Sequence, residues 1–286
     1  MKPAWLKVTV AEAGAVEGMR KILSRHGLHT VCQSARCPNL PRCWGAGTAT
    51  FMILGDVCTR RCRFCATRTG WPGRRVDDGE PERLAGAVAE LGLSYVVLTS
   101  VDRDDLPDGG ATHWARCIRA VKEARPGVLV EALIPDFSGD QGSLAEVLRA
   151  EPDVVGHNLE TVRRLTPLVR DPRASYELSL EVLRKVKELS PRTITKSSLL
   201  LGLGESEEEV REALRDMREA GVDIVVLGQY LRPGPEQLPV ARYLPPEEYA
   251  RWEDEARELG FRAVVAGPLV RTSFRAAEVY RELVCG

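Results

Sequence analysis

The chain has 286 residues, a length that suits one large α/β domain or a core with terminal extensions. Hydrophobic residues make up 44% of it, enough for a sizeable core, and no apolar run approaches the length that spans a membrane. The 40 basic and 41 acidic residues leave a net charge of −1, which gives no reason to expect nucleic acid as the main partner.

The first 50 residues have an irregular pattern that contains one amphipathic stretch, VEGMRKILSRHGL. The opening sequence, MKPAWLKVTVAEAG, has no long apolar region and no small-residue cleavage pattern. We therefore expect no secretory signal and a cytoplasmic location.

From residue 51 the pattern becomes regular, because short apolar, β-branched runs alternate with charged helical segments or long loops. The six strand candidates are TFMIL, SYVVLTS, GVLVEALIP, PDVVGHN, TITKSSLLLG and VDIVVLGQ. Such alternation predicts a parallel sheet with right-handed crossovers. The leading expectation is a partial six-unit (β/α) barrel, and a doubly wound sheet is the alternative.

The chain after this region continues with one more predicted helix, EEYARWEDEARELG, a possible strand, RAVVAG, and a tail, PLVRTSFRAAEVY. The pattern therefore predicts three parts, which are an N-terminal extension (1–50), the barrel (51–235) and a C-terminal extension (236–286).

Six of the eight cysteines fall into two closely spaced triplets, Cys32, Cys37, Cys43 and Cys58, Cys62, Cys65. In a chain without a secretory signal, clustered cysteines bind metal more often than they form disulfides. Cys117 lies in HWARCIRAVKEA at helical spacing, which predicts a small buried hydrophobic residue.

The second triplet has the spacing C-x3-C-x2-C and directly follows the first strand candidate. Barrel enzymes carry their active sites at this carboxyl end of the strands. Three thiolates on one short loop suit a 4Fe–4S cube with one open iron better than zinc, which takes four ligands. The surrounding TRRCRFCATRTGWPGRR is strongly basic, so it is either a solvated loop or an electropositive site for an anionic ligand or partner.

This spacing resembles the signature of the radical S-adenosylmethionine (SAM) enzymes. The resemblance implies that the open iron binds SAM and that an electron from the cluster cleaves it to a 5′-deoxyadenosyl radical. A non-enzymatic zinc-binding module is a competing hypothesis, which the strand–helix pattern argues against.

The first triplet, C-x4-C-x5-C, lies in HTVCQSARCPNLPRCW and closely resembles the auxiliary-cluster segment of the lipoyl synthase family. Further segments resemble that family in the same order along nearly the whole chain. They are YVVLTSVDRDDLPDGGA, LIPDF, HNLETV, TKSSLLLGLGE, LGQYLRPGPEQLPVARY and GPLVRTSFRA.

This second resemblance implies a six-unit partial barrel of the radical SAM type, two 4Fe–4S clusters, and SAM as co-substrate. It implies insertion of sulfur at carbons 6 and 8 of an octanoyl-lysine, with the auxiliary cluster as sulfur donor. The implied partners are an octanoylated lipoyl carrier domain (glycine cleavage H protein or 2-oxoacid dehydrogenase E2), an electron donor and an iron–sulfur carrier, with no nucleic acid and no membrane.

The resemblance to the family also implies that the tail supplies the fourth ligand of the auxiliary cluster. The family ends with Arg-Ser-Ser-Tyr, and this chain reads Arg271-Thr272-Ser273-Phe274. We expect Ser273 to supply the oxygen, with Thr272 as the alternative. A hard oxygen among soft thiolates fits a cluster that is taken apart during the reaction.

The resemblance also assigns SAM contacts. Asn158 and Glu160 of HNLET are implied to contact SAM, although a helix N-cap is the other reading of Asn158. Lys196 of TITKSS is expected to meet a carboxylate, and Ser198 stands nearby where the family usually has glycine.

Two glycine-rich segments complete the expected site. Gly204 of LGLGESEEEV would flank the adenosine, or else belong to an ordinary turn and helix cap. Ser100 and Asp102 of SVDRDDLPDGG would help to position SAM and the cluster, unless this segment is a solvated loop. A competing function is another radical SAM enzyme, whose auxiliary cluster serves only electron transfer or substrate anchoring.

Overall fold

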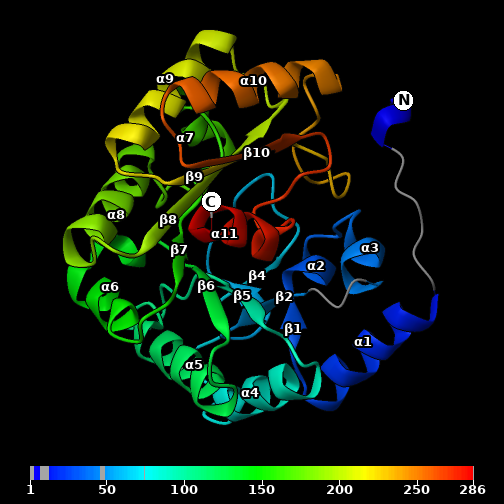
Figure 1. The fold of residues 1–286 in the computed structure, drawn as a ribbon, viewed down its shortest axis with the longest axis vertical. Coiled ribbons are helices and arrows are strands. Elements are labelled where there is room, and N and C mark those ends of the chain that lie inside the picture. The colour runs from blue at the N-terminus through cyan, green and yellow to red at the C-terminus, as the bar shows by residue number, and fades with distance from the viewer. Residues whose placement is uncertain (1–2, 7–12, 46–48, 74, 286) are drawn as a thin grey trace. The chain divides into compact units, whose positions relative to one another are not determined.

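The computed structural model describes residues 3–6, 13–45, 49–73 and 75–285 (Figure 1). It contains two compact units. The N-terminal unit comprises Val8–Arg61 and Ala66–Val155, and the C-terminal unit comprises Cys62–Cys65, Gly156–Gly286 and the N-terminal Met1–Lys7.

The N-terminal unit is built on a sheet in which β2, β5 and β6 are parallel and β1 is antiparallel to β2. A separate parallel pair, β3 and β4, follows β2. The strands are β1 (His29–Thr30), β2 (Thr50–Ile53), β3 (Val57–Cys58), β4 (Arg68–Thr69), β5 (Tyr95–Ser100) and β6 (Leu129–Leu133). The helices are α1 (Ala13–Arg25), α2 (Val31–Ser34), α3 (Leu40–Gly45), α4 (Glu80–Glu90), α5 (Ala111–Ala124), η2 (Phe137–Gly139) and α6 (Gln141–Leu148).

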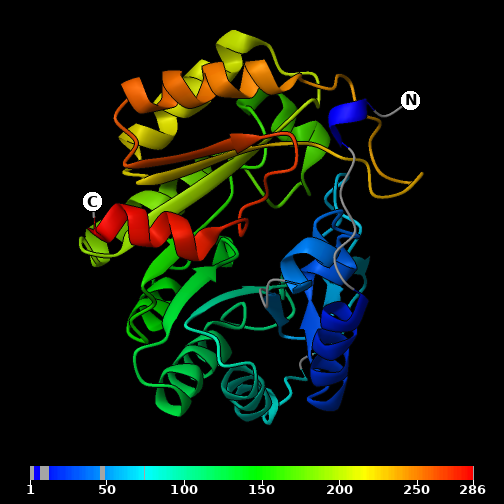
Figure 2. The ribbon, with the colours of Figure 1, turned by 45° about the vertical axis from the view of Figure 1, so that its right-hand side comes forward.

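The core of this unit lies between the sheet and its helices. Helix α5 buries Trp114, Cys117, Ile118 and Val121, which recur at the spacing of one helix face. Figures 1 and 2 show α4, α5 and α6 next to one another along the sheet. Cys117 is completely buried, which confirms its prediction as a core residue.

The C-terminal unit is built on β8, β9 and β10, which are parallel neighbours. The strands are β8 (Ile194–Leu201), β9 (Ile224–Gln229) and β10 (Ala263–Gly267). The helices are η1 (Ala4–Leu6), η3 (Arg163–Leu165), α7 (Thr166–Val169), α8 (Tyr176–Leu189), α9 (Glu207–Glu219), α10 (Pro246–Glu258) and α11 (Ala276–Cys285). The chain passes from one unit to the other within β7 (Val154–Gly156).

Strand β9 is buried at every residue, as expected of a parallel strand covered on both faces. Helix α9 packs the residues Val210, Ala213, Leu214 and Met217 into the same core cluster. Figure 2 shows α10 on one side of β9 and β10, and α11 on the other.

The predicted strand–helix order is confirmed. The six predicted strands are β2, β5, β6, β7, β8 and β9, and their helices are α4, α5, α6, α8, α9 and α10. The possible strand RAVVAG is β10. No helix in the described part of the chain is long and apolar enough to cross a membrane.

The terminal parts contain more structure than the sequence pattern indicated. Around the first triplet the chain forms the short helices α2 and α3, and the tail ends in helix α11. The reason for the first difference is length, since helices of four and six residues are too short to produce a hydrophobic period.

Candidate active site

The first cysteine triplet lies in the N-terminal unit, on two short helices and the turn between them. Thr30 caps α2 by accepting a hydrogen bond from the backbone N–H of Gln33 at 3.4 Å. The Cys37 N–H donates to the Cys32 carbonyl at 3.0 Å, and the Cys43 N–H donates to the Asn39 carbonyl at 2.8 Å. These local hydrogen bonds fold the segment back on itself and bring the cysteines together.

The electrostatics show that these three thiols are neighbours. Burial, followed by the charges of Cys32 and Cys37, raises the pKa of the Cys43 thiol to about 11. The pKa of Cys32 is also raised, mainly by burial and in part by Cys37. Three thiolates in one place repel one another, so a bound cation or cluster would relieve their repulsion.

The surroundings of the first triplet fit an iron–sulfur cluster. The seven cysteines whose side chains the structure describes, which include both triplets, are thiols rather than halves of disulfides. The indole N–H of Trp44 is buried, and it lies close enough to the Cys32 sulfur to lower the pKa of that thiol against the larger effect of burial. It follows Cys43 directly in the sequence, and cluster sulfurs accept hydrogen bonds of this kind.

The raised pKa of Cys43 has a consequence for the metal-free protein. The shift from 9.0 to about 11 keeps the thiol protonated, which lowers its thiolate fraction at pH 8 by about a hundredfold. We expect Cys43 to be alkylated by iodoacetamide about a hundredfold more slowly in the folded, metal-free protein than in the urea-unfolded protein. Peptide mass spectrometry measures the two rates. Equal rates in both states would contradict this.

Cys58, the first cysteine of the second triplet, ends β3 in the N-terminal unit. The Arg60 N–H donates to its sulfur at 3.4 Å, and its thiol lies 3.7 Å from the Asp102 carboxylate. The Asp102 carbonyl accepts hydrogen bonds at 3.0 Å from both the N–H and the hydroxyl of Thr59. Asp102, which the sequence placed in the site, is therefore beside the cluster loop.

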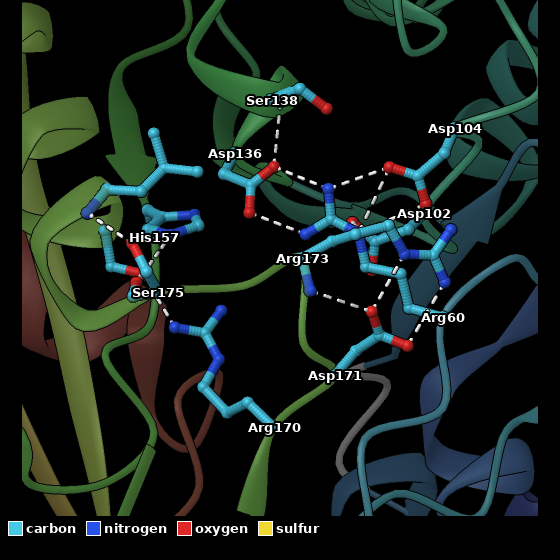
Figure 3. Close-up of polar contacts among 12 residues, drawn as sticks. Arg60, Asp102, Asp104, Asp136, Ser138, His157, Arg170, Asp171, Arg173 and Ser175 are labelled. Atoms are coloured by element: carbon cyan, nitrogen blue, oxygen red, sulfur yellow. Dashed lines mark hydrogen bonds and ion pairs between the residues drawn. The ribbon is translucent and has the colours of Figure 1, made fainter. Parts of the chain in front are cut away.

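Arg60 anchors this loop to the ends of two strands. Its guanidinium forms ion pairs with Asp102 at 3.4 Å and Asp104 at 2.8 Å after β5, and with Asp136 at 2.5 Å after β6 (Figure 3). Burial alone would lower the pKa of Arg60, but the hydrogen bonds that its guanidinium donates to Asp136 and Asp104 outweigh burial and raise the pKa. The Arg60 side chain is 4% exposed, so the interpretation of the basic segment as a solvated loop is wrong at this residue.

The segment SVDRDDLPDGG is likewise not a solvated loop. Arg103 and Asp105 form a buried ion pair at 2.8 Å, with side chains 3% and 1% exposed. The indole N–H of Trp114 donates to the Ser100 hydroxyl at 3.2 Å, which fixes the end of β5.

Sequence reasoning missed the residues that hold the turn before the cluster loop. Leu54 has a left-handed backbone (φ 66°), and its N–H donates to the Glu80 carboxylate at 2.8 Å. Glu80 in turn lies 2.7 Å from His113 Nε2, and both side chains are buried. Arg103 donates to the Leu54 carbonyl at 3.3 Å. A glutamate at a helix start and a histidine inside a helix carry no sequence signal for this contact.

Cys62 and Cys65 lie in the C-terminal unit. The Asp171 N–H donates to the Cys62 sulfur at 3.3 Å, a contact that suits a thiolate bound to iron. The Cys65 N–H donates to the Cys62 carbonyl at 3.1 Å, and the Arg63 N–H donates to the Val169 carbonyl at 2.8 Å. The Asp171 carboxylate is held by Arg173 at 2.8 Å (Figure 3).

Asn158 and Glu160 follow β7, and no helix begins at Asn158, so its reading as an N-cap is wrong. The Asn158 amide donates to the Glu160 carboxylate at 3.0 Å. Glu160 has a left-handed backbone (φ 68°), which the strand β8 holds by hydrogen bonds to both its N–H and its carbonyl. Strain of this kind is typical of functional sites. Burial raises the pKa of Glu160.

Lys196 and Ser198 lie on β8 itself. The Lys196 side chain is 2% exposed, and its carbonyl accepts a hydrogen bond from the His157 N–H at 3.0 Å. The Ser198 carbonyl accepts from the Glu160 N–H at 3.0 Å. The residues expected at this strand are therefore beside the HNLET segment.

The tail crosses β9 where Gly228 leaves room for it. A Cβ at Gly228 would lie 2.3 Å from the Val270 carbonyl oxygen, closer than real Cβ contacts come. Two residues on, the Thr272 hydroxyl lies 3.1 Å from Asn158 Nδ2 and 3.1 Å from the Ser198 hydroxyl. The tail thus reaches the residues expected to contact SAM.

Gly204 lies in the turn before α9. Its backbone is left-handed (φ 110°), and the Glu205 carboxylate accepts the N–H groups of Gly202 and Leu203 at 2.5 and 2.9 Å. Ser206 and Glu209 form a capping box at the start of α9. The turn and cap expected at this segment are confirmed, and its contact with adenosine stays a prediction.

Comparison with known proteins identifies the chain's relatives. Residues 52–228 match the model of the radical SAM superfamily. A lipoyl synthase of Thermus thermophilus is 60% identical over 281 residues, covering 98% of this chain and 87% of that protein. A lipoyl synthase of Methanocella arvoryzae is 55% identical over 283 residues, covering 99% and 96%.

Solved structures share the fold at low sequence identity. Methylornithine synthase aligns with a TM-score of 0.57 at 15% identity, covering 87% of this chain and 81% of that one. The FeFe-hydrogenase maturase HydG of Carboxydothermus hydrogenoformans aligns with a TM-score of 0.52 at 13% identity, covering 95% and 78%. The expected radical SAM type of α/β fold is thereby confirmed over the doubly wound alternative.

Proposed function

The chain belongs to the lipoyl synthase family of the radical SAM superfamily, and on that premise we propose that it inserts two sulfur atoms into a protein-bound octanoyl group. The acceptor is an N6-octanoyl-lysine, and carbons 6 and 8 receive the sulfur to give the lipoyl group. The single observation that carries this proposal beyond radical SAM chemistry in general is the cluster of Cys32, Cys37 and Cys43, a second thiol site outside the C-x3-C-x2-C loop.

Family membership brings a 4Fe–4S cluster and SAM, and we assign Cys58, Cys62 and Cys65 to that cluster. A second cluster would be held by the thiols of the first triplet. When bound, the cluster at Cys58, Cys62 and Cys65 would supply, together with SAM, the radical that activates an unreactive C–H bond. The cluster at the first triplet would supply the sulfur. The chain's own part is to hold the thiols. Backbone N–H groups of Arg60 and Asp171 already donate to two of the sulfurs.

The fourth ligand of the second cluster is assigned to Ser273. Its support is the resemblance of Arg271-Thr272-Ser273-Phe274 to the family's final motif, and the Thr272 hydroxyl has a different set of contacts, with Asn158 and Ser198. This choice keeps the two hydroxyls in separate roles, because one holds the tail and the other binds iron.

SAM is assigned to side chains on or just after the parallel strands and to one glycine-rich turn. Carboxylates and amides hold a zwitterionic ligand well when each charge meets a fixed partner. The assigned residues are Ser100, Asp102, Asn158, Glu160, Lys196 and Gly204.

The partners follow from the reaction. The substrate is an octanoylated lipoyl carrier domain, either glycine cleavage H protein or a 2-oxoacid dehydrogenase E2, and an electron donor and an iron–sulfur carrier serve the clusters. We keep the cytoplasmic location and the division into an N-terminal extension (1–50), a barrel (51–235) and a C-terminal extension (236–286) as predictions from the sequence.

Iron content tests the second cluster directly. After anaerobic reconstitution, the wild type should hold about eight irons and about eight acid-labile sulfides per chain, because two cubanes bind. Cys32→Ala should hold about four of each, as measured by iron and sulfide assays on the purified proteins.

The opposite result is equally informative. About four irons in the wild type, with no loss in Cys32→Ala, would contradict the sulfur-donor site. An unchanged lipoyl yield with about four irons in Cys32→Ala would show that the auxiliary cluster does not supply the sulfur.

A further inference from the structure

Three separate segments of the C-terminal unit meet at the Thr272 hydroxyl. It lies 3.1 Å from Asn158 Nδ2, which comes from the segment after β7, and 3.1 Å from the Ser198 hydroxyl, which comes from β8. Thr272 itself belongs to the tail, one residue before Ser273. All of these distances are those of ordinary hydrogen bonds.

The network continues from Thr272 to a carboxylate. The Asn158 amide that donates to Thr272 also donates to Glu160 Oε1 at 3.0 Å. The backbone around Glu160 is fixed to β8 on both sides, by Glu160 N–H to the Ser198 carbonyl at 3.0 Å and by Leu200 N–H to the Glu160 carbonyl at 2.8 Å. The backbone at Glu160 and Ser198 is therefore held by this pairing, and the network above it is made by side chains.

We propose that Thr272 is a positioning residue that couples SAM binding to the placement of the C-terminal tail. This inference rests on the proposed assignment of Asn158 and Glu160 to SAM. The Thr272 hydroxyl orients the Asn158 amide toward Glu160, and the same hydrogen bonds hold the tail that carries Ser273. SAM and the tail therefore stabilise each other through one network.

The coupling runs in both directions by thermodynamic necessity. If the tail's hydroxyl strengthens SAM binding by some factor, SAM strengthens the tail's attachment by the same factor. A neutral hydrogen bond in a partly buried network contributes enough to change an affinity about three- to tenfold. Ser198 takes part in the same network, so its hydroxyl and that of Thr272 act as a pair rather than independently.

The test compares Thr272→Val, which keeps the shape and removes the hydroxyl, with Thr272→Ser, which keeps the hydroxyl. SAM affinity is measured by equilibrium dialysis on the anaerobically reconstituted full chain, at equal iron content. We expect SAM to bind about three- to tenfold more weakly to Thr272→Val and with unchanged affinity to Thr272→Ser. Hydrogen exchange of residues 268–276 should slow when SAM is added to the wild type, but not to Thr272→Val.

A matched control comes from a second hydroxyl pair in the same unit. Ser190 and Thr193 lie 2.7 Å apart, so Thr193→Val also removes one member of a Ser–Thr pair, and it should leave SAM affinity unchanged. Equal SAM affinity in the wild type and Thr272→Val would overturn the coupling while leaving the proposed function intact. Failure of the reconstituted wild type to bind SAM would instead overturn the proposed function, and the coupling with it.

Discussion

Cys62→Ala is expected to abolish SAM cleavage altogether. Without Cys62 the C-x3-C-x2-C loop offers its cluster two thiolates instead of three, so the open iron that binds SAM would be lost. The loss of rate should exceed about a thousandfold, because no other group in the family's chemistry supplies the radical. Formation of 5′-deoxyadenosine with a strong reductant, followed by chromatography, measures this effect.

Cys37→Ala is the matched control from the other triplet. It should leave the cleavage of SAM in place, uncoupled from product, while lipoyl formation on an octanoylated carrier stops. If Cys37→Ala still produced lipoyl groups, the first triplet would not be the sulfur donor. SAM cleavage that persisted in Cys62→Ala would show that the C-x3-C-x2-C loop does not hold the reactive cluster.

Arg60→Ala is expected to lower the free energy of unfolding by about 3–5 kcal/mol, because it leaves three neighbouring carboxylates without their buried cation. The Arg60 side chain is 4% exposed, so water does not replace the lost contacts. Denaturation by urea at neutral pH, monitored by circular dichroism, measures the change. Arg60→Lys should restore little of it, since an ammonium group cannot bridge several carboxylates as a guanidinium does.

Arg68→Ala provides the comparison for the arginine substitution. Arg68 pairs with Asp56 at 2.8 Å, but the two side chains are 67% and 37% exposed, so this pair should contribute less than about 1 kcal/mol. Similar losses for the two variants would contradict the anchoring role of Arg60.

The strands and helices of the repeating region were predictable because their patterns are long. The segment SEEEVREALRDMREAG combines a capping box with a sustained apolar face, and it forms α9 as expected. Cysteine spacing alone marks the first triplet as a candidate metal site, which stays a prediction. Its short helices could not be predicted, since they depend on caps such as Thr30 rather than on a period.

The contacts that join distant segments could not be predicted from the pattern. The sequence offers Asp102 as a candidate site residue but gives no sign that Asp102, Asp104 and Asp136 surround one arginine. Likewise it offers Thr272 only as an alternative oxygen ligand and does not indicate its hydrogen-bond partners. Its partners Asn158 and Ser198 lie 114 and 74 residues away in the sequence, and only the fold brings them together.

The crossing of the tail over Gly228 sets how closely the segment before Ser273, the proposed oxygen donor, approaches β9. Gly228 has no side chain, so the Val270 carbonyl can approach the backbone of β9 more closely than any other residue at position 228 would allow. A methyl group at position 228 would have to displace the carbonyl by about 0.7 Å to reach even 3.0 Å. The size of the residue at position 228 thus sets the distance between the tail and β9. A larger residue at position 228 would therefore shift the tail, and Ser273 with it, without changing any residue that we propose as a cluster ligand.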